Sequence, residues 1–250
     1  MITSETIAIA SDETIGSIAA KDYRKAEVFK KLSIDFCCGG NRTLKEASEE
    51  AGISEGELKL QLEQADAPTT KTSSQDYNKW ELDFLTDYII NTHHRYIKDN
   101  VSIINDLAGK VAKHHGENHP ELPELEINIQ RFLQDMMNHM NKEEGALFPK
   151  IKQLVANKNN PGLTVKMPAG FVKDAVKMMQ LEHEVAGEDL QFFRKITNDY
   201  LLPEDACNSY NLLFEKMKEF EDDLIQHIHL ENNILFPKAT KLDDELALKN

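Results

Sequence analysis

The sequence predicts an all-α protein, with a four-helix bundle as its larger part and a small helical domain before it. Apolar residues recur at alternating steps of three and four over four long stretches, which is the pattern of one buried helix face. Only 11 glycines and 8 prolines occur in 250 residues, a small share that favours long helices. Four such helices can bury their apolar faces against one another in a bundle.

The composition is that of a globular chain with an acidic surface. Hydrophobic residues make up 40% and charged residues 29%, which excludes disorder in bulk. The 43 acidic residues outnumber the 29 basic ones and give a net charge of -14, so phosphate backbones and anionic membranes are repelled. We therefore expect no nucleic-acid partner and no membrane association.

The sequence indicates neither export nor membrane insertion. No apolar run approaches the roughly 18–20 residues of a membrane-spanning helix. The first 25 residues lack the basic start and the sustained apolar region of a secretory signal. Three cysteines, two of them adjacent, do not make a disulfide framework. A reducing, cytoplasmic location is the expectation.

A polar stretch without apolar periodicity, residues 67–78, is predicted to link two domains. It separates a small helical domain, residues 1–66, from the predicted bundle, residues 79–245. Short helices are expected over 15–23 and 24–32, before a turn formed by two adjacent glycines. The spacing of capping boxes predicts two further helices, one at Thr43 with Glu46 and one at Ser54 with Glu57.

The last two helices of the small domain, joined around Gly52, resemble a helix-turn-helix. A negative face in the major groove is repelled by the phosphates, so a small packing unit is favoured over DNA binding. The charged residues on the second helix are Glu55, Glu57, Lys59, Glu63 and Asp66.

Two segments of the larger domain repeat one another, HMNKEEGALFPKI at 139–151 and HIHLENNILFPKA at 227–239. The shared residues indicate a duplicated two-helix unit. Pro149 and Pro237 follow the glutamates by about one and a half turns. Because proline removes a helix hydrogen bond, each helix is expected to end or kink there, with the preceding Leu-Phe in the core.

Each of the four apolar stripes is interrupted by a histidine, and two are interrupted again by a glutamate four residues later. A lone histidine on an apolar face is usually a core residue whose hydrogen bonds are satisfied. A histidine on each of four apolar stripes, however, indicates one common cause. The central residues are Ile90, His94, Ile97 and Val101 in the first stripe, Met136, His139, Glu143 and Ala146 in the second, Met179, His183 and Ala186 in the third, and Leu224, His227, Glu231 and Ile234 in the fourth.

A metal centre would neutralise all six polar residues, which otherwise cost several kcal/mol each when buried as ions without partners. Residues four apart lie on one side of a helix, about 6 Å from each other. Each His-x-x-x-Glu pair can therefore point a nitrogen and a carboxylate inward. The predicted metal ligands are His94, His139, Glu143, His183, His227 and Glu231.

The number and type of ligands indicate two ions. Six ligands are too many for a closed tetrahedral zinc site, whereas they suit two ions bridged by carboxylates, each with an open position. Imidazole and carboxylate together favour iron or manganese. Ferritin-like sites use Glu-x-x-His, so the order here is reversed and the spacing is one residue longer.

The other histidines are expected outside this centre. His93 lies about 100° round the helix from His94 and His229 faces away from its stripe. His114, His115 and His119 are expected in a solvated loop before the next helix.

Cys37 and Cys38 are adjacent, which would strain a disulfide between them. They could be a redox pair, ligands for a transferred metal or a link between subunits, and the turn and helix start after them would lower a thiol pKa. Two small buried residues are the simpler alternative, and the spacing does not exclude it. Cys207 stands alone on an expected helix.

The combination of motifs resembles the iron–sulfur cluster repair di-iron proteins, the RIC family of ScdA and YtfE type. The matching segments are IDFCCGGNRTL, THHR, HMNKEE-x-x-LFP, LEHE-x-x-GE and LENN-x-LFP, which cover nearly the whole chain. The resemblance implies a hemerythrin-like bundle with two non-haem irons on the six positions, bridged by Glu143 and Glu231. THHR is the loosest match, and it leaves His93 as the alternative to His94. A cytoplasmic homodimer is also implied.

The resemblance further implies repair of iron–sulfur clusters damaged by nitric oxide or oxidants, so damaged iron–sulfur proteins are the expected partners. The centre would supply iron, with a redox or iron-transfer role for Cys37 and Cys38. One alternative is reduction of nitric oxide to nitrous oxide. Another is reversible oxygen or nitric oxide binding as in true hemerythrins, which use five histidines where these stripes offer four. A purely structural bundle leaves the six polar residues unexplained.

Overall fold

The computed structural model describes residues 9–65, 76–160 and 170–247. The chain forms two compact units, which divide in the sequence between Trp80 and Glu81, except that residues 229–234 are grouped with the first unit, and each is described by itself. The described residues are mostly helical and hold no β-strand beyond an isolated bridge. The predicted all-α class is confirmed. Residues 67–75 of the predicted linker lie outside the described ranges.

Four short helices form the N-terminal unit, and side-chain caps determine where they begin. Thr14, Asp22, Thr43 and Ser54 each accept a backbone N–H from the first turn that follows. The predicted capping box of Thr43 with Glu46 is confirmed in both directions. The helices are α1 (Ile15–Lys21), α2 (Tyr23–Lys31), α3 (Leu44–Glu50) and α4 (Glu55–Gln64), and a 3-10 turn, η1 (Tyr77–Lys79), comes before the second unit.

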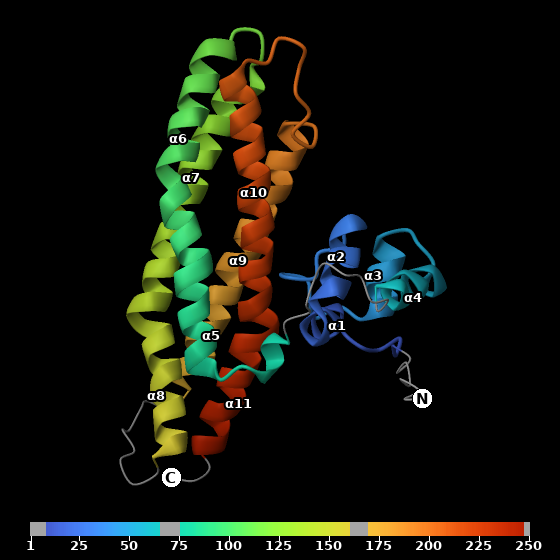
Figure 1. Cartoon of the computed structure of the whole chain (residues 1–250), viewed down its shortest axis with the longest axis vertical. Coiled ribbons are helices and arrows are strands. Elements are labelled where there is room, and N and C mark those ends of the chain that lie inside the picture. The colour runs from blue at the N-terminus through green and yellow to red at the C-terminus, as the bar shows by residue number, and fades with distance from the viewer. Residues whose placement is uncertain (1–8, 66–75, 161–169, 248–250) are drawn as a thin grey trace, which may run out of the picture. The chain divides into compact units, whose positions relative to one another are not determined.

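Four helical rods run side by side in the second unit (Figure 1). Three of them consist of two α-helices joined by a π-helical turn, and the third in chain order is a single α-helix. In the order of the chain, the rods are α5 (Leu82–Ile89), η2 (Ile90–His94) and α6 (Arg95–His115); α7 (Glu121–Lys142), η3 (Glu143–Leu147) and α8 (Phe148–Asn159); α9 (Phe171–Ile196); and α10 (Asn208–Leu230), η5 (Glu231–Leu235) and α11 (Phe236–Ala247). The predicted four-helix bundle is confirmed.

Two of the three π-helical turns shift the buried stripe by one residue, whereas Ile234 in η5 is buried as predicted. A π-turn bonds residues five apart, whereas an α-turn bonds residues four apart. After Glu143, the next buried residue of η3 is Leu147, and Ala146, which was predicted on the stripe, is exposed. The apolar residue buried before His94 is Ile89, five positions back, and Ile90 is half-buried. The stripe of α9, which has no π-turn, is buried as predicted.

The prolines after the repeated motifs do not end their helices. Pro149 and Pro237 are the second residues of α8 and α11, which each run for 12 residues. Proline is tolerated in the first turn of a helix, because its missing N–H would have no partner within the helix there. The interruption lies just before each proline, in the π-turn.

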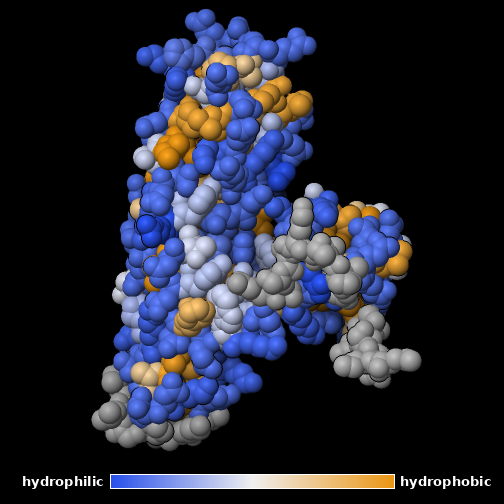
Figure 2. Space-filling view, in the orientation of Figure 1, coloured by the Kyte–Doolittle hydropathy of each residue, from blue (hydrophilic) through white to orange (hydrophobic). Residues whose placement is uncertain are grey.

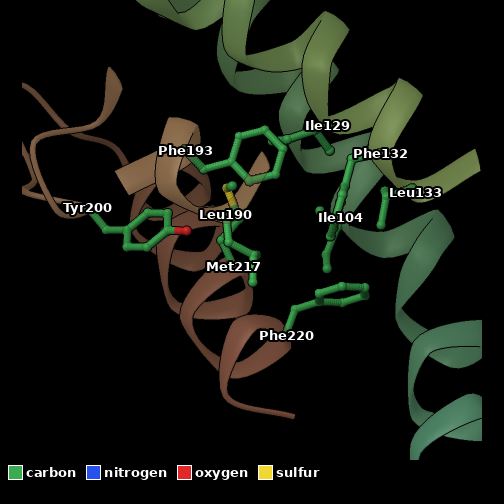
Figure 3. Close-up of a pocket in the computed structure, with 9 residues that line it drawn as sticks. All are labelled: Ile104, Ile129, Phe132, Leu133, Leu190, Phe193, Tyr200, Met217 and Phe220. Carbon is green, nitrogen blue, oxygen red and sulfur yellow. The ribbon is translucent and has the colours of Figure 1, made fainter. Parts of the chain in front are cut away.

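One part of the bundle core away from the histidines is lined mainly by apolar side chains. A cavity of about 20 Å³ lies there, and Figure 3 shows the aromatic rings around it. Phe132 packs edge to face on Phe193 and Phe220, at centroid distances of 5.3 and 5.8 Å. Phe132 precedes His139 by seven residues, so this apolar layer is about 10 Å along the helix from the histidine.

Hydrophilic residues cover most of the face of the bundle drawn in Figure 2, in keeping with the net charge of -14. Among the described helices, none is long and apolar enough to cross a membrane. One exposed apolar row follows α9, where Met178, Leu181 and Val185 are 56%, 54% and 49% exposed.

Candidate metal centre

The six side chains predicted as metal ligands meet inside the bundle, one or two from each rod. Each is at most 2% exposed. Their nitrogen and oxygen atoms form two groups, and within each group all lie within 4.8 Å of one another. The first group is His94, Glu143, His227 and Glu231, and the second is His139, Glu143, His183 and Glu231. Both glutamates therefore belong to both groups.

Glu143 reaches a histidine in each group. Its Oε2 lies 3.3 Å from His94 Nε2, and its Oε1 lies 3.4 Å from His139 Nε2. The histidines are paired across the bundle, with 3.1 Å between Nε2 of His94 and His227 and 3.0 Å between Nε2 of His139 and His183. A carboxylate placed in this way can bridge two cations.

The spacing of the imidazole nitrogens fits an ion shared by each pair. At a metal–nitrogen distance of about 2.1 Å, separations of 3.0 and 3.1 Å correspond to an angle of roughly 90–95° at the ion. Such an angle is typical of octahedral rather than tetrahedral coordination. Two histidines with carboxylates and open positions form the donor set of many non-haem iron sites. The residues therefore fit a pair of such cations.

Two further carboxylates orient the imidazoles from outside. Glu144 Oε1 lies 2.8 Å from His94 Nδ1, and Glu182 Oε2 lies 2.9 Å from His139 Nδ1. The bond from His139, with help from Lys142, lowers the pKa of Glu182 to about 2. Because an ionised carboxylate only accepts hydrogen bonds, Nδ1 of each histidine must donate. In the neutral imidazole, Nε2 then keeps a lone pair directed at the centre.

The repeated Leu-Phe-Pro segment has a role at this centre beyond general core packing. Phe148 stacks on the ring of His94 at 5.6 Å, and Phe236 stacks on the ring of His183 at 6.0 Å. Each of these aromatic rings therefore covers one ligand histidine and limits its rotation. The repeated segment therefore provides two similar ring contacts, one to a histidine of each ligand group.

Two histidines expected to face away are buried instead. His93 is 1% exposed, stacks on His227 at 5.7 Å, and places its Nδ1 2.9 Å from Asp223 Oδ1. His229 is also 1% exposed, and burial lowers its pKa to about 3. Neither histidine belongs to the two groups of ligand atoms. The first rod contributes His94 to these groups.

The loop expected for the three histidines near residue 115 is shorter than predicted. His114 and His115 are the last residues of α6, so only His119 lies between helices. Its Nε2 is 2.9 Å from Asp205 Oδ1, and this bond raises the pKa of His119.

Comparison with known families matches residues 85–239 to the hemerythrin HHE cation binding domain and residues 11–66 to ScdA_N, a domain of unknown function. The chain is also similar to proteins named iron-sulfur cluster repair protein YtfE. The one from Yersinia pestis is 31% identical over 231 residues, which is 92% of this chain and 97% of the relative. The one from Pectobacterium atrosepticum is 32% identical over 230 residues, with the same two coverages. The chain belongs to the iron–sulfur cluster repair (RIC) family.

Membership of the RIC family and the geometry of the bundle agree on metal binding. The matched HHE domain is a cation-binding domain, and the two buried His/Glu groups lie within residues 85–239. The larger domain of this RIC protein is therefore a hemerythrin-like, metal-binding bundle.

The cysteines of this RIC protein lie in two different environments. Cys37 and Cys38 lie together with Asp35, a neighbour that the sequence analysis missed. Hydrogen bonding to Cys38, burial and the charge of Asp35 raise the pKa of Cys37, so the lowering expected from a helix start is wrong for this thiol. Cys207 is exposed, and His115 lowers its pKa to about 7.

Proposed function

We propose that this protein is a di-iron protein that repairs iron–sulfur clusters damaged by nitrosative or oxidative stress, by supplying iron to them. One observation carries the proposal: two groups of buried imidazoles share the same two glutamates, Glu143 and Glu231. This arrangement suits two ions of the same kind close together. The names of the RIC relatives point to damaged iron–sulfur proteins as the clients.

The residues have distinct tasks in this proposal. When bound, the irons provide ferrous ions that can be returned to a damaged cluster. Four neutral imidazoles hold them less firmly than thiolates would, which favours release. Glu144 and Glu182 keep a proton on Nδ1 of His94 and His139, so that Nε2 stays available. Burial of all six ligands excludes bulk water from the centre.

The test combines metal analysis with a repair assay. Purified protein should contain about two irons per chain, and the iron-loaded protein should reactivate a hydro-lyase whose [4Fe–4S] cluster was damaged by nitric oxide. A variant with His139→Ala and Glu143→Ala should lose both properties. His114→Ala, an exposed histidine on the same bundle, is the matched control and should keep them. Equal recovery with the double variant would refute iron supply.

A second candidate is chemistry on a diatomic molecule, either nitric oxide reduction or reversible binding of oxygen or nitric oxide. The cavity in Figure 3 favours it, because about 20 Å³ of apolar space holds one small molecule and is unattractive to water. Nitrous oxide formed with a supplied electron donor would indicate the reductase. A stable oxygen adduct in the absorption spectrum would indicate the carrier.

We also propose a homodimer that works in the reducing cytoplasm. The exposed row of Met178, Leu181 and Val185 on α9 supports self-association, since a partner would remove it from water. In the described ranges no cysteine is in a disulfide, as a reducing compartment would require. Light scattering should give the mass of two chains, and Leu181→Glu should give the mass of one.

A further inference from the structure

Asp35 organises the loop that carries the adjacent cysteines. Its Oδ1 accepts the backbone N–H of Cys37 at 3.1 Å and of Cys38 at 3.0 Å, and its Oδ2 accepts that of Gly39 at 3.0 Å. One carboxylate therefore binds three consecutive amides and holds the loop as a tight turn. The positions of both thiols follow from this turn.

Packing explains the second glycine of the motif. A Cβ on Gly40 would lie 2.7 Å from the Phe36 carbonyl oxygen, whereas a Cβ on Gly39 would meet only the guanidinium at the end of the flexible Arg42 side chain. Packing does not explain the cysteines in the same way. Cys37 is 8% exposed, but Cys38 is half-buried and reaches the surface of the loop.

The two sulfurs are placed as they would be around one ion. Sγ of Cys37 and Sγ of Cys38 are 3.7 Å apart. Two thiolates at about 2.3 Å from a tetrahedral ion are separated by roughly 3.8 Å. Asp35 Oδ1 lies 3.3 Å from Cys37 Sγ, and the three side chains form one group of close ligand atoms.

A disulfide fits this geometry less well. The described chain has no cis peptide bond, and Cα atoms joined by a trans peptide are about 3.8 Å apart. Disulfides usually need a separation of about 4.4 Å or more. The observed arrangement of the thiols therefore favours a shared cation over a bond between the sulfurs.

Arg42, which follows the cysteines closely in the sequence, directs its guanidinium at oxygen atoms. The guanidinium of Arg42 donates to the carbonyls of Asp35 and Gly39 and to the carboxylate of Glu50. Hydrogen bonding to Cys38, burial and the charge of Asp35 hold the pKa of Cys37 above its usual value. Binding forms two metal–sulfur bonds, and each S–H bond that it breaks releases its proton to water, with no change in oxidation state.

We propose that Cys37 and Cys38 together bind one thiophilic divalent cation of the Fe²⁺ class, with Asp35 as the residue that positions them. Two protein sulfurs leave coordination positions open, which suits a site that takes up and passes on its ion rather than a structural site. Binding itself does not require iron in the bundle, whereas its use as an iron acceptor during repair rests on the proposed function.

Cobalt(II) is the probe that separates the two sites. The six bundle ligands offer only nitrogen and oxygen, so thiolate-to-cobalt charge-transfer absorption in the near ultraviolet reports sulfur ligation alone. The iron-loaded, full-length protein is titrated with Co²⁺ under reducing, oxygen-free conditions. We expect the band to saturate at one cobalt per chain, without a change in oligomeric state. The readout stays valid even if the bundle does not donate iron.

Variants assign the band to the loop. Cys37→Ser with Cys38→Ser should abolish it, and Cys207→Ser, which removes the exposed thiol elsewhere, should leave it unchanged. Asp35→Asn keeps both sulfurs and should weaken the affinity about 10- to 100-fold, as is typical when a group that orients ligands is lost. Circular dichroism confirms that each variant is folded.

Three outcomes would overturn the proposal. The first is the absence of a sulfur band in the reduced wild-type protein. The second is an unchanged band in the double serine variant. The third is saturation at half a cobalt per chain, which would mean that the ion joins two copies and is not held within one loop.

Discussion

The bundle centre and the loop around Cys37 gather potential metal ligands in opposite ways. In the centre, six nitrogen and oxygen ligands come from four rods and are buried almost completely. In the loop, two sulfurs and one carboxylate come from a stretch of four residues and are held mainly by backbone amides. The centre therefore depends on the tertiary structure of a whole domain, whereas local hydrogen bonds to Asp35 shape the turn that carries the sulfurs. Perturbing each one should have different consequences for metal content and stability.

The largest expected effect concerns the shared carboxylate. Glu143→Gln removes a negative ligand that reaches both histidine pairs, so both ions should be lost together. Metal analysis should show iron falling from about two per chain to well below one. Glu124→Gln, at an exposed position on the same rod, should leave the iron content unchanged. Loss of only one iron from Glu143→Gln would show that the carboxylate is not shared.

Metal removal should destabilise the bundle. An ion that binds only the folded state at 100 times its dissociation constant adds about 2.7 kcal/mol to the free energy of unfolding. Chelation of two ions should therefore lower the midpoint of thermal unfolding markedly. The Glu143→Gln variant, which starts with little metal, should show almost no shift. A chelator that leaves the wild-type midpoint unchanged would contradict ligation by all four rods.

A smaller effect is expected from the carboxylates behind the ligands. Glu182→Gln removes the charged acceptor of His139 Nδ1–H, so iron affinity should fall about 10- to 100-fold. Competition with a chelator of known affinity measures this change. Glu184→Gln, exposed on the same helix, is the matched control. Equal affinities for the two variants would mean that Glu182 does not orient the histidine.

The smallest effect distinguishes the thiols by their reactivity. The pKa of Cys207 is about 7, so its reactive thiolate fraction rises from about a tenth at pH 6 to about nine tenths at pH 8. The pKa of Cys37 is raised, so it remains a thiol over this range. Mass spectrometry after brief alkylation should find Cys207 modified first, with a midpoint near pH 7. Faster labelling of Cys37 would contradict this order.

The sequence by itself determined which six polar side chains meet at the centre of the bundle. Alternating steps of three and four identify one face of a helix, and a histidine on such a face stands out because burial of a polar group needs a partner. That reasoning selected His94, His139, His183 and His227, and the two glutamates four residues after a histidine. The capping box at Thr43 was equally visible, because its hydrogen bonds connect residues only three apart.

Only the tertiary structure decided two things. The first is which residues of each stripe are buried beyond the ligands, and the second is which side chains surround the ligands. The sequence pattern assumes 3.6 residues per turn, so it placed Ala146 in the core, but a π-turn buries Leu147 instead. Glu182 and Asp223 orient histidines of other rods, and no spacing along the chain relates them to those partners. Periodicity reports which face of one helix is apolar, whereas contacts between helices depend on how all four rods pack.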